Sequence, residues 1–308
     1  MQSSNNKAEL SIIIISYNTR QITENCINSI YKSFSLSLRN KQQVPKFEII
    51  IIDNASTDGS KEMLERYKKK HNNLKIIESN INQGFAKANN YASKITKAKY
   101  LLFLNSDIIV VDDAIVRLFR FFQQNENTFN FLGGKLLNKD NTSQPSCGKF
   151  YSLPIVFASL FLKGDYWNLT RYSPKKIKQV DWISGACILT KKELFDKVGR
   201  FDENIFMYMD ELDLLYRAKN KGYKVFFYPD SKFIHLGSAS SKGKTYPILQ
   251  VYKGFIYFYK KHYSSFELFL LKVMLKLKAL IAILIGNIIN NQYLVKTYEQ
   301  AYNLVKKT

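Results

Sequence analysis

Several residue types that mark common classes of protein are scarce in this sequence. Its 308 residues contain 3 cysteines, Cys26, Cys147 and Cys187, which are too few and too scattered for a disulfide framework or a cysteine metal cluster. This cysteine usage favours a reducing, cytoplasmic compartment. The polar segment from Met1 to Glu9 lacks the apolar core of a secretory signal, which agrees with that expectation.

Acidic residues are also scarce, with 25 Asp and Glu against 46 Lys and Arg and a net charge of +21. Such an excess suits an anionic partner such as nucleic acid, a phosphorylated lipid or an acidic membrane face. A lysine-rich surface that is simply solvated is the alternative. The sequence has no RNA-binding signature, no zinc finger and no basic helix with interleaved aromatics, so we expect no nucleic-acid partner.

Long hydrophobic runs are missing as well. The longest uncharged apolar stretch near the C-terminus, 279–289, has about eleven residues, whereas a spanning helix needs roughly twenty. From Val251 onward there are nine lysines but only Glu267 and Glu299 as acids. Basic and apolar residues together favour a helix that lies on an anionic membrane surface, peripheral on the inner face of the cell membrane. A helix that caps the core, or a homodimer contact, is the alternative.

What is present is a regular alternation of strands and helices. Apolar, β-branched runs predict strands, and stretches with helical periodicity lie between them. Short connections of this kind are typical of a parallel α/β sheet, in which ligands bind beyond the carboxyl ends of the strands. The predicted strands are 10–15, 47–52, 74–77 and 100–104, and the predicted helices are 20–34, 63–70 and 86–95.

Polar residues follow the first two strands. Tyr17 could stack on a nucleobase, with Ser16 and Asn18 beside a ribose. Asp53 could accept a hydrogen bond from a pyrimidine N3–H, or it could cap the next helix. A later turn runs into a helix that suits phosphate or ribose contacts, and it contains Asn82, Gly84, Lys87 and Asn90.

Further candidates are carboxylates and one histidine. Asp107 follows the fourth strand and is the best metal-ligand candidate, while Ser106 beside it could reach the ribose. His235 could complete the metal site or contact phosphate. Asp210 and Glu211 begin a predicted helix and could supply the base that deprotonates an acceptor hydroxyl, although acids at a helix start also simply favour the helix dipole.

In order along the chain, these motifs resemble glycosyltransferase family 2, the inverting enzymes with the GT-A fold. The likeness covers about residues 10–262. Each block is weak alone, but the ordered set is specific: Ser11 to Asn18, Ile52 to Ser60, Asn82 to Asn90, Leu102 to Asp107, Asp181 to Cys187, Val198 to Glu203, Phe206 to Leu214 and His235 to Ser238.

The resemblance implies a Rossmann-like mixed sheet flanked by helices. We expect a catalytic domain over 1–245, with an irregular insertion or lid over 133–180, and a basic, apolar helical tail over 246–308. The resemblance also implies that Tyr17 and Asp53 bind the nucleobase of the donor and that Asp107 ligates Mg²⁺ or Mn²⁺. Glu211 is the expected catalytic base, with Asp210 as its alternative.

The block from Asp181 to Cys187, with Gln144 to Cys147 upstream, is most similar to the rhamnosyltransferase branch. That branch implies transfer of L-rhamnose from dTDP-rhamnose to a lipid-linked or growing cell-surface polysaccharide. Asp181 and Trp182 are then expected to line the sugar or acceptor pocket. Two positions depart from the family pattern: Asn105 replaces an acid two residues before Asp107, and the acidic pair has reversed order.

Three alternatives remain open. The same fold could use a UDP-hexose or UDP-HexNAc donor, or the chain could be a non-catalytic relative that binds glycans or membranes. A sugar-phosphate nucleotidyltransferase would share the nucleotide site, but it should have a glycine-rich basic loop after its first strand. This chain has the sequence from Ser16 to Thr19 there instead.

Overall fold

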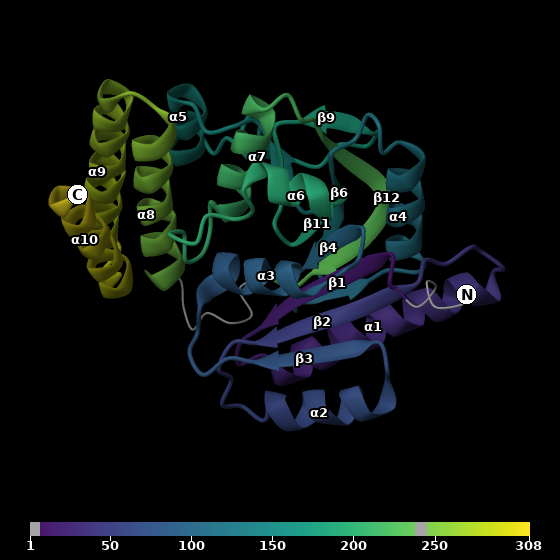
Figure 1. Ribbon diagram of the computed structural model, residues 1–308. Coiled ribbons are helices and arrows are strands. Elements are labelled where there is room, and N and C mark those ends of the chain that lie inside the picture. The colour runs from purple at the N-terminus through teal and green to yellow at the C-terminus, as the bar shows by residue number, and fades with distance from the viewer. Residues whose placement is uncertain (1–6, 238–244) are drawn as a thin grey trace.

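The computed structural model describes residues 7–237 and 245–308, so Ser238, the last residue of the family-like motifs, lies outside the described residues. A nine-stranded central sheet runs through the protein in the order β3-β2-β1-β4-β11-β6-β12-β5, and β9 pairs with β12 (Figure 1). Its strands are β1 (Leu10–Ser16), β2 (Phe47–Asp53), β3 (Leu74–Glu78), β4 (Tyr100–Leu104), β5 (Ile108–Val110), β6 (Phe131–Leu137), β9 (Lys178–Val180), β11 (Cys187–Lys191) and β12 (Val225–His235).

The four strands predicted from the alternation are all present, and they pair in parallel. β11 then runs antiparallel between β4 and β6, which makes the sheet mixed, as the family resemblance implied. A second sheet has three short strands in the order β10-β7-β8, with β7 (Cys147–Gly148), β8 (Arg171–Tyr172) and β10 (Trp182–Ile183).

Helices cover both faces of the central sheet, because successive side chains of its strands point to opposite sides. Ile12 and Ile14 pack with α1 and α4, whereas Ile13 packs in the cluster that contains α3, α6 and α7. The helices of this catalytic part are α1 (Arg20–Arg39), α2 (Ser60–Lys70), α3 (Gly84–Ile95), α4 (Ala114–Gln124), α5 (Leu153–Phe161), α6 (Lys192–Val198) and α7 (Asp210–Asn220).

The expected irregular insertion over 133–180 is wrong at its start, because β6 lies in the middle of the central sheet. The consecutive glycines Gly133 and Gly134 have the composition of a turn. In the structure they serve close packing: an added Cβ would lie 2.9 Å from Ile183 and 2.4 Å from Phe233. The remainder of the segment forms α5 and short strands beside the site.

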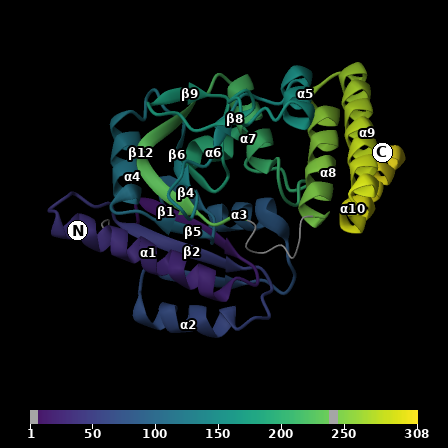
Figure 2. The ribbon, with the colours of Figure 1, turned by 180° about the vertical axis from the view of Figure 1, so that it is seen from behind.

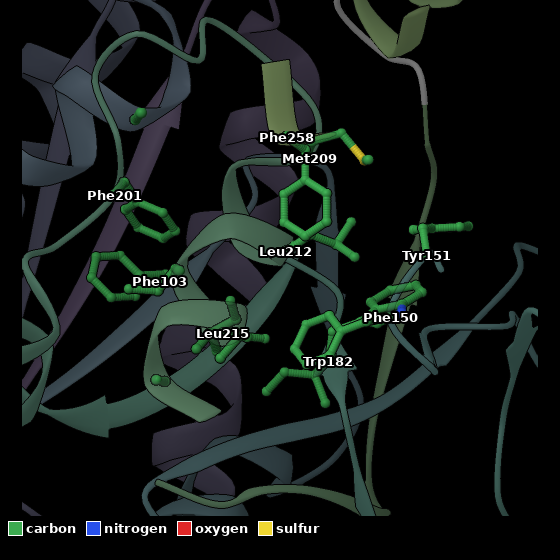
Figure 3. Close-up of a cluster of buried hydrophobic side chains, with 14 of the residues drawn as sticks. Phe103, Phe150, Tyr151, Trp182, Phe201, Met209, Leu212, Leu215 and Phe258 are labelled. Carbon is green, nitrogen blue, oxygen red and sulfur yellow. The ribbon is translucent and has the colours of Figure 1, made fainter. Parts of the chain in front are cut away.

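The predicted helical tail is three helices, α8 (Thr245–His262), α9 (Ser265–Ile288) and α10 (Gln292–Lys307), which stand side by side at one edge of the molecule in both views (Figures 1 and 2). α8 joins the main core through Phe255, Phe258 and Tyr259. Figure 3 shows Phe258 close to Met209 and Leu212 at the start of α7. Among the described residues, no helix is long and apolar enough to cross a membrane.

Candidate active site

One cavity of about 770 Å³ collects residues from strand ends that are far apart in the sequence. This volume lies in the range of sites that hold small organic ligands. The predicted site residues that line it are Tyr17, Asn82, Gly84, Ser106, Asp107, Trp182, Asp210, Glu211 and His235.

The wall near β1 and α3 is built by a close backbone approach. Gly84 has φ +77°, and an added Cβ would lie 2.6 Å from the carbonyl oxygen of Phe206. The next amide, Phe85 N–H, donates to that same oxygen at 3.0 Å. Asn54 donates through Nδ2 to Asn82 Oδ1 at 2.8 Å. Glycine is therefore required at this turn, which places the loop before α3 against the loop before α7.

Asp107 and His235 form a pair on the cavity wall. Asp107 Oδ1 lies 3.4 Å from His235 Nε2. Gln144 fixes the ring: its Nε2 donates to Asn138 Oδ1 at 3.1 Å and to the His235 carbonyl at 3.3 Å, so its Oε1 faces His235 Nδ1 at 2.7 Å and accepts from it. His235 therefore donates from Nδ1 to Gln144, and Nε2 faces the Asp107 carboxylate.

This donor set fits a divalent cation. A carboxylate oxygen and an imidazole nitrogen lie 3.4 Å apart on the cavity wall, and such a pair suits Mn²⁺ or a similar ion. Asn105 Nδ2 lies 3.5 Å from the same Nε2, so the residue that replaces the usual acid is also at this point. Among residues 7–237 and 245–308, no group of three or more His, Cys, Asp or Glu could hold a metal. A bound cation would therefore need oxygens from its ligand to complete the coordination.

The acidic pair lies at the start of α7, after two residues with left-handed backbone, Tyr208 (φ +63°) and Met209 (φ +67°). Such φ values are unfavourable for side chains of this size, so packing must hold the turn. Gly254 of α8 provides that packing, because an added Cβ would lie 2.7 Å from Met209 Cγ. The turn aims Asp210 and Glu211 at the cavity.

Burial raises the pKa of both carboxyls. For Asp210, which is 4% exposed, the negative charge of Glu211 and their mutual hydrogen bond raise the pKa further. Glu211 is held lower than its neighbour by hydrogen bonds from backbone amides, by Asp210 and by the charge of Arg171. The two carboxyls therefore share a buried site in which both pKa values are raised, and the charge of Arg171 favours the ionised form of Glu211.

A network behind the pair fixes α7. Asp213 is buried and accepts from Arg217 Nε at 2.8 Å and from His262 Nε2 and Lys261 Nζ at 2.7 Å. Burial acts to raise the pKa of Asp213, but these donors outweigh it and hold the pKa below its usual range. Because Lys261 and His262 belong to α8, the first tail helix is part of the scaffold of the site.

Several predicted site residues lie outside the cavity lining. Ser16, the last residue of β1, hydrogen-bonds through its hydroxyl to Thr23 of α1, whereas Asn18 bonds to Ser56 and Thr57 in the loop beyond β2. Lys87 is exposed on α3, and Asn90 ties α3 to the Phe201 backbone and to Glu203.

Asp181 and Trp182 separate, although they are adjacent in sequence. Trp182 is buried, lines the cavity and donates through Nε1 to the Lys149 carbonyl at 2.9 Å. Asp181 faces the opposite way, where it accepts from Phe150 N–H at 3.1 Å and pairs with Lys219 at 2.8 Å. The alternation of side chains along the chain explains the split, and it removes Asp181 from the cavity wall.

Asp53 occupies an intermediate position. It is fully buried at the end of β2, beside Ser16 in register, and its Oδ2 accepts from Ser56 N–H at 3.1 Å. Among the described residues, Oδ1 has no hydrogen-bond partner. A buried acceptor without a donor is costly, so this oxygen suits an N–H donor, but Asp53 is not among the residues that line the cavity.

The structure adds residues to the site for which the sequence had predicted no role there. Arg171, from the short strand β8, lines the cavity and donates through Nε to Asp165 Oδ2 at 2.8 Å. Gln144 orients His235 from 91 residues away. Tyr151 of the loop before α5 and Phe255 of α8 also line the cavity. These residues reach the site through short irregular strands and through contacts between segments far apart in the sequence. Neither feature produces a pattern in the neighbouring sequence that would predict it.

Comparison with known proteins identifies the family. The sequence pattern described as glycosyl transferase family 2 matches residues 11–199. The chain belongs to this family. The match covers β1 through α6 and thus includes Tyr17, Asp53 and Asp107, while the acidic pair lies beyond it.

The relatives of this chain include a beta-glucosyltransferase and an L-rhamnosyltransferase. The chain is 35% identical over 131 residues to the poly(ribitol-phosphate) beta-glucosyltransferase of Bacillus spizizenii. This alignment covers 42% of the chain and 19% of the relative. The chain is 26% identical over 221 residues to the N-acetylglucosaminyl-diphospho-decaprenol L-rhamnosyltransferase of Mycobacterium tuberculosis. This alignment covers 65% of the chain and 69% of the relative. The chain thus spans less than a fifth of the first relative and about two thirds of the second.

The solved structure of GalNAc-T7 with UDP, GalNAc and Mn²⁺ shares the fold, with a TM-score of 0.56 at 17% identity over 83% of this chain and 50% of that one. The expected GT-A architecture, a mixed sheet flanked by helices and followed by C-terminal helices, is therefore confirmed. At this identity the likeness concerns the fold alone.

Replacing Asp210 by asparagine is expected to stabilise the protein at alkaline pH. A carboxyl whose pKa is raised on folding contributes stability below its unfolded pKa of about 4, and this contribution is lost as pH rises through the folded value. The variant has no such loss, so its melting temperature should exceed wild type by roughly 2–4 °C near pH 8 for each kcal/mol removed. The difference should shrink toward pH 4 in thermal melts; a difference independent of pH would contradict the raised pKa.

Proposed function

We propose that the protein is an inverting glycosyltransferase that moves one sugar from a nucleotide diphosphate donor to a glycan hydroxyl. The observation that carries this proposal is that the Asp107–His235 pair and the Asp210–Glu211 pair open onto one cavity. One pair suits the diphosphate side of a donor and the other suits the acceptor hydroxyl, as a single displacement at the anomeric carbon requires.

The donor nucleotide is assigned to the β1–β2 side of the cavity. Tyr17 offers an aromatic face to the base, and the unpartnered Oδ1 of Asp53 suits a pyrimidine N3–H. Asp107 and His235 would hold Mg²⁺ or Mn²⁺ beside the diphosphate. When bound, such a cation supplies positive charge against the charge that grows on the leaving diphosphate.

Glu211 is proposed as the base. In its ionised form it accepts the proton of the acceptor hydroxyl, while Asp210 keeps its own proton and hydrogen-bonds to Glu211. Trp182 lines the same cavity and could pack an aromatic face on a sugar ring. Arg171 lies near enough to Glu211 to favour its ionised form.

For the donor sugar, L-rhamnose from dTDP-rhamnose is our first proposal, supported by the motif around Trp182 and by the rhamnosyltransferase among the relatives. A UDP-hexose or UDP-HexNAc is the second, supported by the beta-glucosyltransferase relative. The proposed acceptor is a lipid-linked or growing cell-surface polysaccharide on the inner face of the cell membrane.

Calorimetric titration tests the donor without an acceptor. We expect dTDP-rhamnose to bind at least about tenfold more tightly than UDP-glucose, UDP-galactose or UDP-GlcNAc, and only when Mn²⁺ is present. Tighter binding of a UDP-sugar would support the transferase function but would contradict rhamnose as the donor sugar. Binding of none of the four would contradict the proposed donor site and favour a non-catalytic glycan-binding relative.

A further inference from the structure

The tail exposes a second surface that the transfer chemistry does not use. α9 has 24 residues and packs against α5, α8 and α10. At 3.6 residues per turn, the buried residues of α9 fall on a single narrow face. They are Leu271, Leu275, Ala279, Ala282 and Gly286.

The side of α9 opposite to this buried face is also apolar, although it is exposed. Leu284 is 60% exposed and Phe266 is 68% exposed. The same helical spacing places them about 180° from the buried face, together with Val273, Leu277 and Leu280. We call these five residues the outer stripe. An exposed apolar stripe of this length marks an interaction surface, because isolated exposed side chains would not align along one face.

Lysines border the outer stripe. Lys272 and Lys276 flank one edge of the outer stripe, whereas Lys278 falls beside the buried face, by the same helical spacing. The only acid in α9, Glu267, is used internally: its carboxylate accepts from the Ser264 backbone and hydroxyl in a capping box. The helix therefore presents an apolar face with a positive border.

We infer that the outer stripe and its lysine border seat the protein on an anionic membrane surface, with α9 lying in the plane of the interface. An apolar helix face bordered by lysines matches acyl chains beneath negatively charged headgroups. A second copy of this chain fits less well, because face-to-face pairing would bring two lysine borders together in a protein of net charge +21.

This seating places the cavity close to the bilayer. α8 lies between α9 and the cavity, since its Val251 and Phe255 line the cavity while the Tyr252 hydroxyl donates to the Leu275 carbonyl of α9 at 3.3 Å. Packed helices lie about 8–10 Å apart. This step rests on the proposed function: an acceptor whose lipid stays in the bilayer would reach the acidic pair past α9 and α8.

The experiment is flotation of the full chain with vesicles of phosphatidylcholine alone or mixed with phosphatidylglycerol. Wild type should float with the mixed vesicles and much less with the neutral ones. Leu284→Asp should bind the mixed vesicles at least about tenfold more weakly, because it introduces a charge into the apolar face. Leu38→Asp is the matched control, as Leu38 is 63% exposed on α1, and it should bind like wild type.

A second variant tests the lysine border separately. The double change of Lys272 and Lys276 to Gln should weaken binding to the anionic vesicles by about fivefold for each lysine, and raised salt should produce a similar loss in wild type. Melting temperatures of all variants should match wild type, since every altered side chain is at least partly exposed.

Equal flotation of the Leu284→Asp and Leu38→Asp proteins would overturn the inference. So would a wild-type dimer in light scattering that Leu284→Asp makes monomeric, without any vesicle binding, because the stripe would then belong to a second copy. Donor titration of the same samples separates the two proposals. Intact donor binding without flotation contradicts only the membrane surface, and flotation without donor binding contradicts only the transferase site.

Discussion

Replacing Glu211 by glutamine is expected to lower kcat by about a thousandfold while leaving donor affinity unchanged. A positioned general base contributes on the order of 10²- to 10⁴-fold, and the amide of glutamine cannot accept the hydroxyl proton. The shape of the side chain is retained, so the packing at the start of α7 should persist. Single-turnover rates with a soluble acceptor, together with donor titration, measure the two quantities separately.

Asp210→Asn is the matched control for this result. The amide of asparagine can still donate to Glu211, as the protonated Asp210 carboxyl does, so the variant should keep at least about a tenth of wild-type kcat. If Asp210→Asn abolishes transfer and Glu211→Gln does not, the base is the other member of the pair.

The pH dependence of wild type adds an independent check on the base. Glu211 must be ionised to act, and burial raises its pKa. The acid limb of the kcat profile should therefore lie above the ordinary carboxyl range near 4.3, with activity falling as pH falls through it. In Asp210→Asn this limb should remain, because burial is the largest cause of the raised pKa of Glu211.

Much of the fold could be predicted because its strands are short apolar runs with clear ends. The run 100–104 coincides with β4, and the first strand and helix begin where predicted. The segment from 133 onward was wrongly predicted to be irregular, because consecutive glycines occur both in turns and where strands pack closely. The close packing is visible only in the structure, where Ile183 and Phe233 approach these glycines from other strands. The mixed direction of the sheet came from the family resemblance and not from periodicity.

The site was predictable where one residue follows a strand end directly. Tyr17, Ser106 and Asp107 line the cavity for that reason. Prediction was poorer where side-chain direction decides: adjacent Asp181 and Trp182 face opposite ways. Nothing near Arg171 or Gln144 in sequence links them to Glu211 or His235, so their contributions depend on the completed fold.

Asp107→Asn is expected to abolish metal-dependent donor binding and to lower transfer by at least about a hundredfold. Asparagine retains the shape and one carbonyl oxygen, but it removes the negative charge that a hard divalent cation requires. Of the protein groups at this point, only the neutral His235 and the Asn105 amide would remain. Two neutral groups cannot replace the carboxylate, because among the described residues no larger cluster of metal ligands exists.

Calorimetry with and without Mn²⁺ measures this effect, and Asp230→Asn is its control. Asp230 is an exposed carboxylate on β12, the strand that also carries His235, and it is not among the residues that line the cavity. The control should bind donor as wild type does. If donor binding by Asp107→Asn still depends on Mn²⁺, the cation is held by other residues. His235→Ala should weaken Mn²⁺-dependent binding less than Asp107→Asn, since the carboxylate supplies charge as well as a ligand.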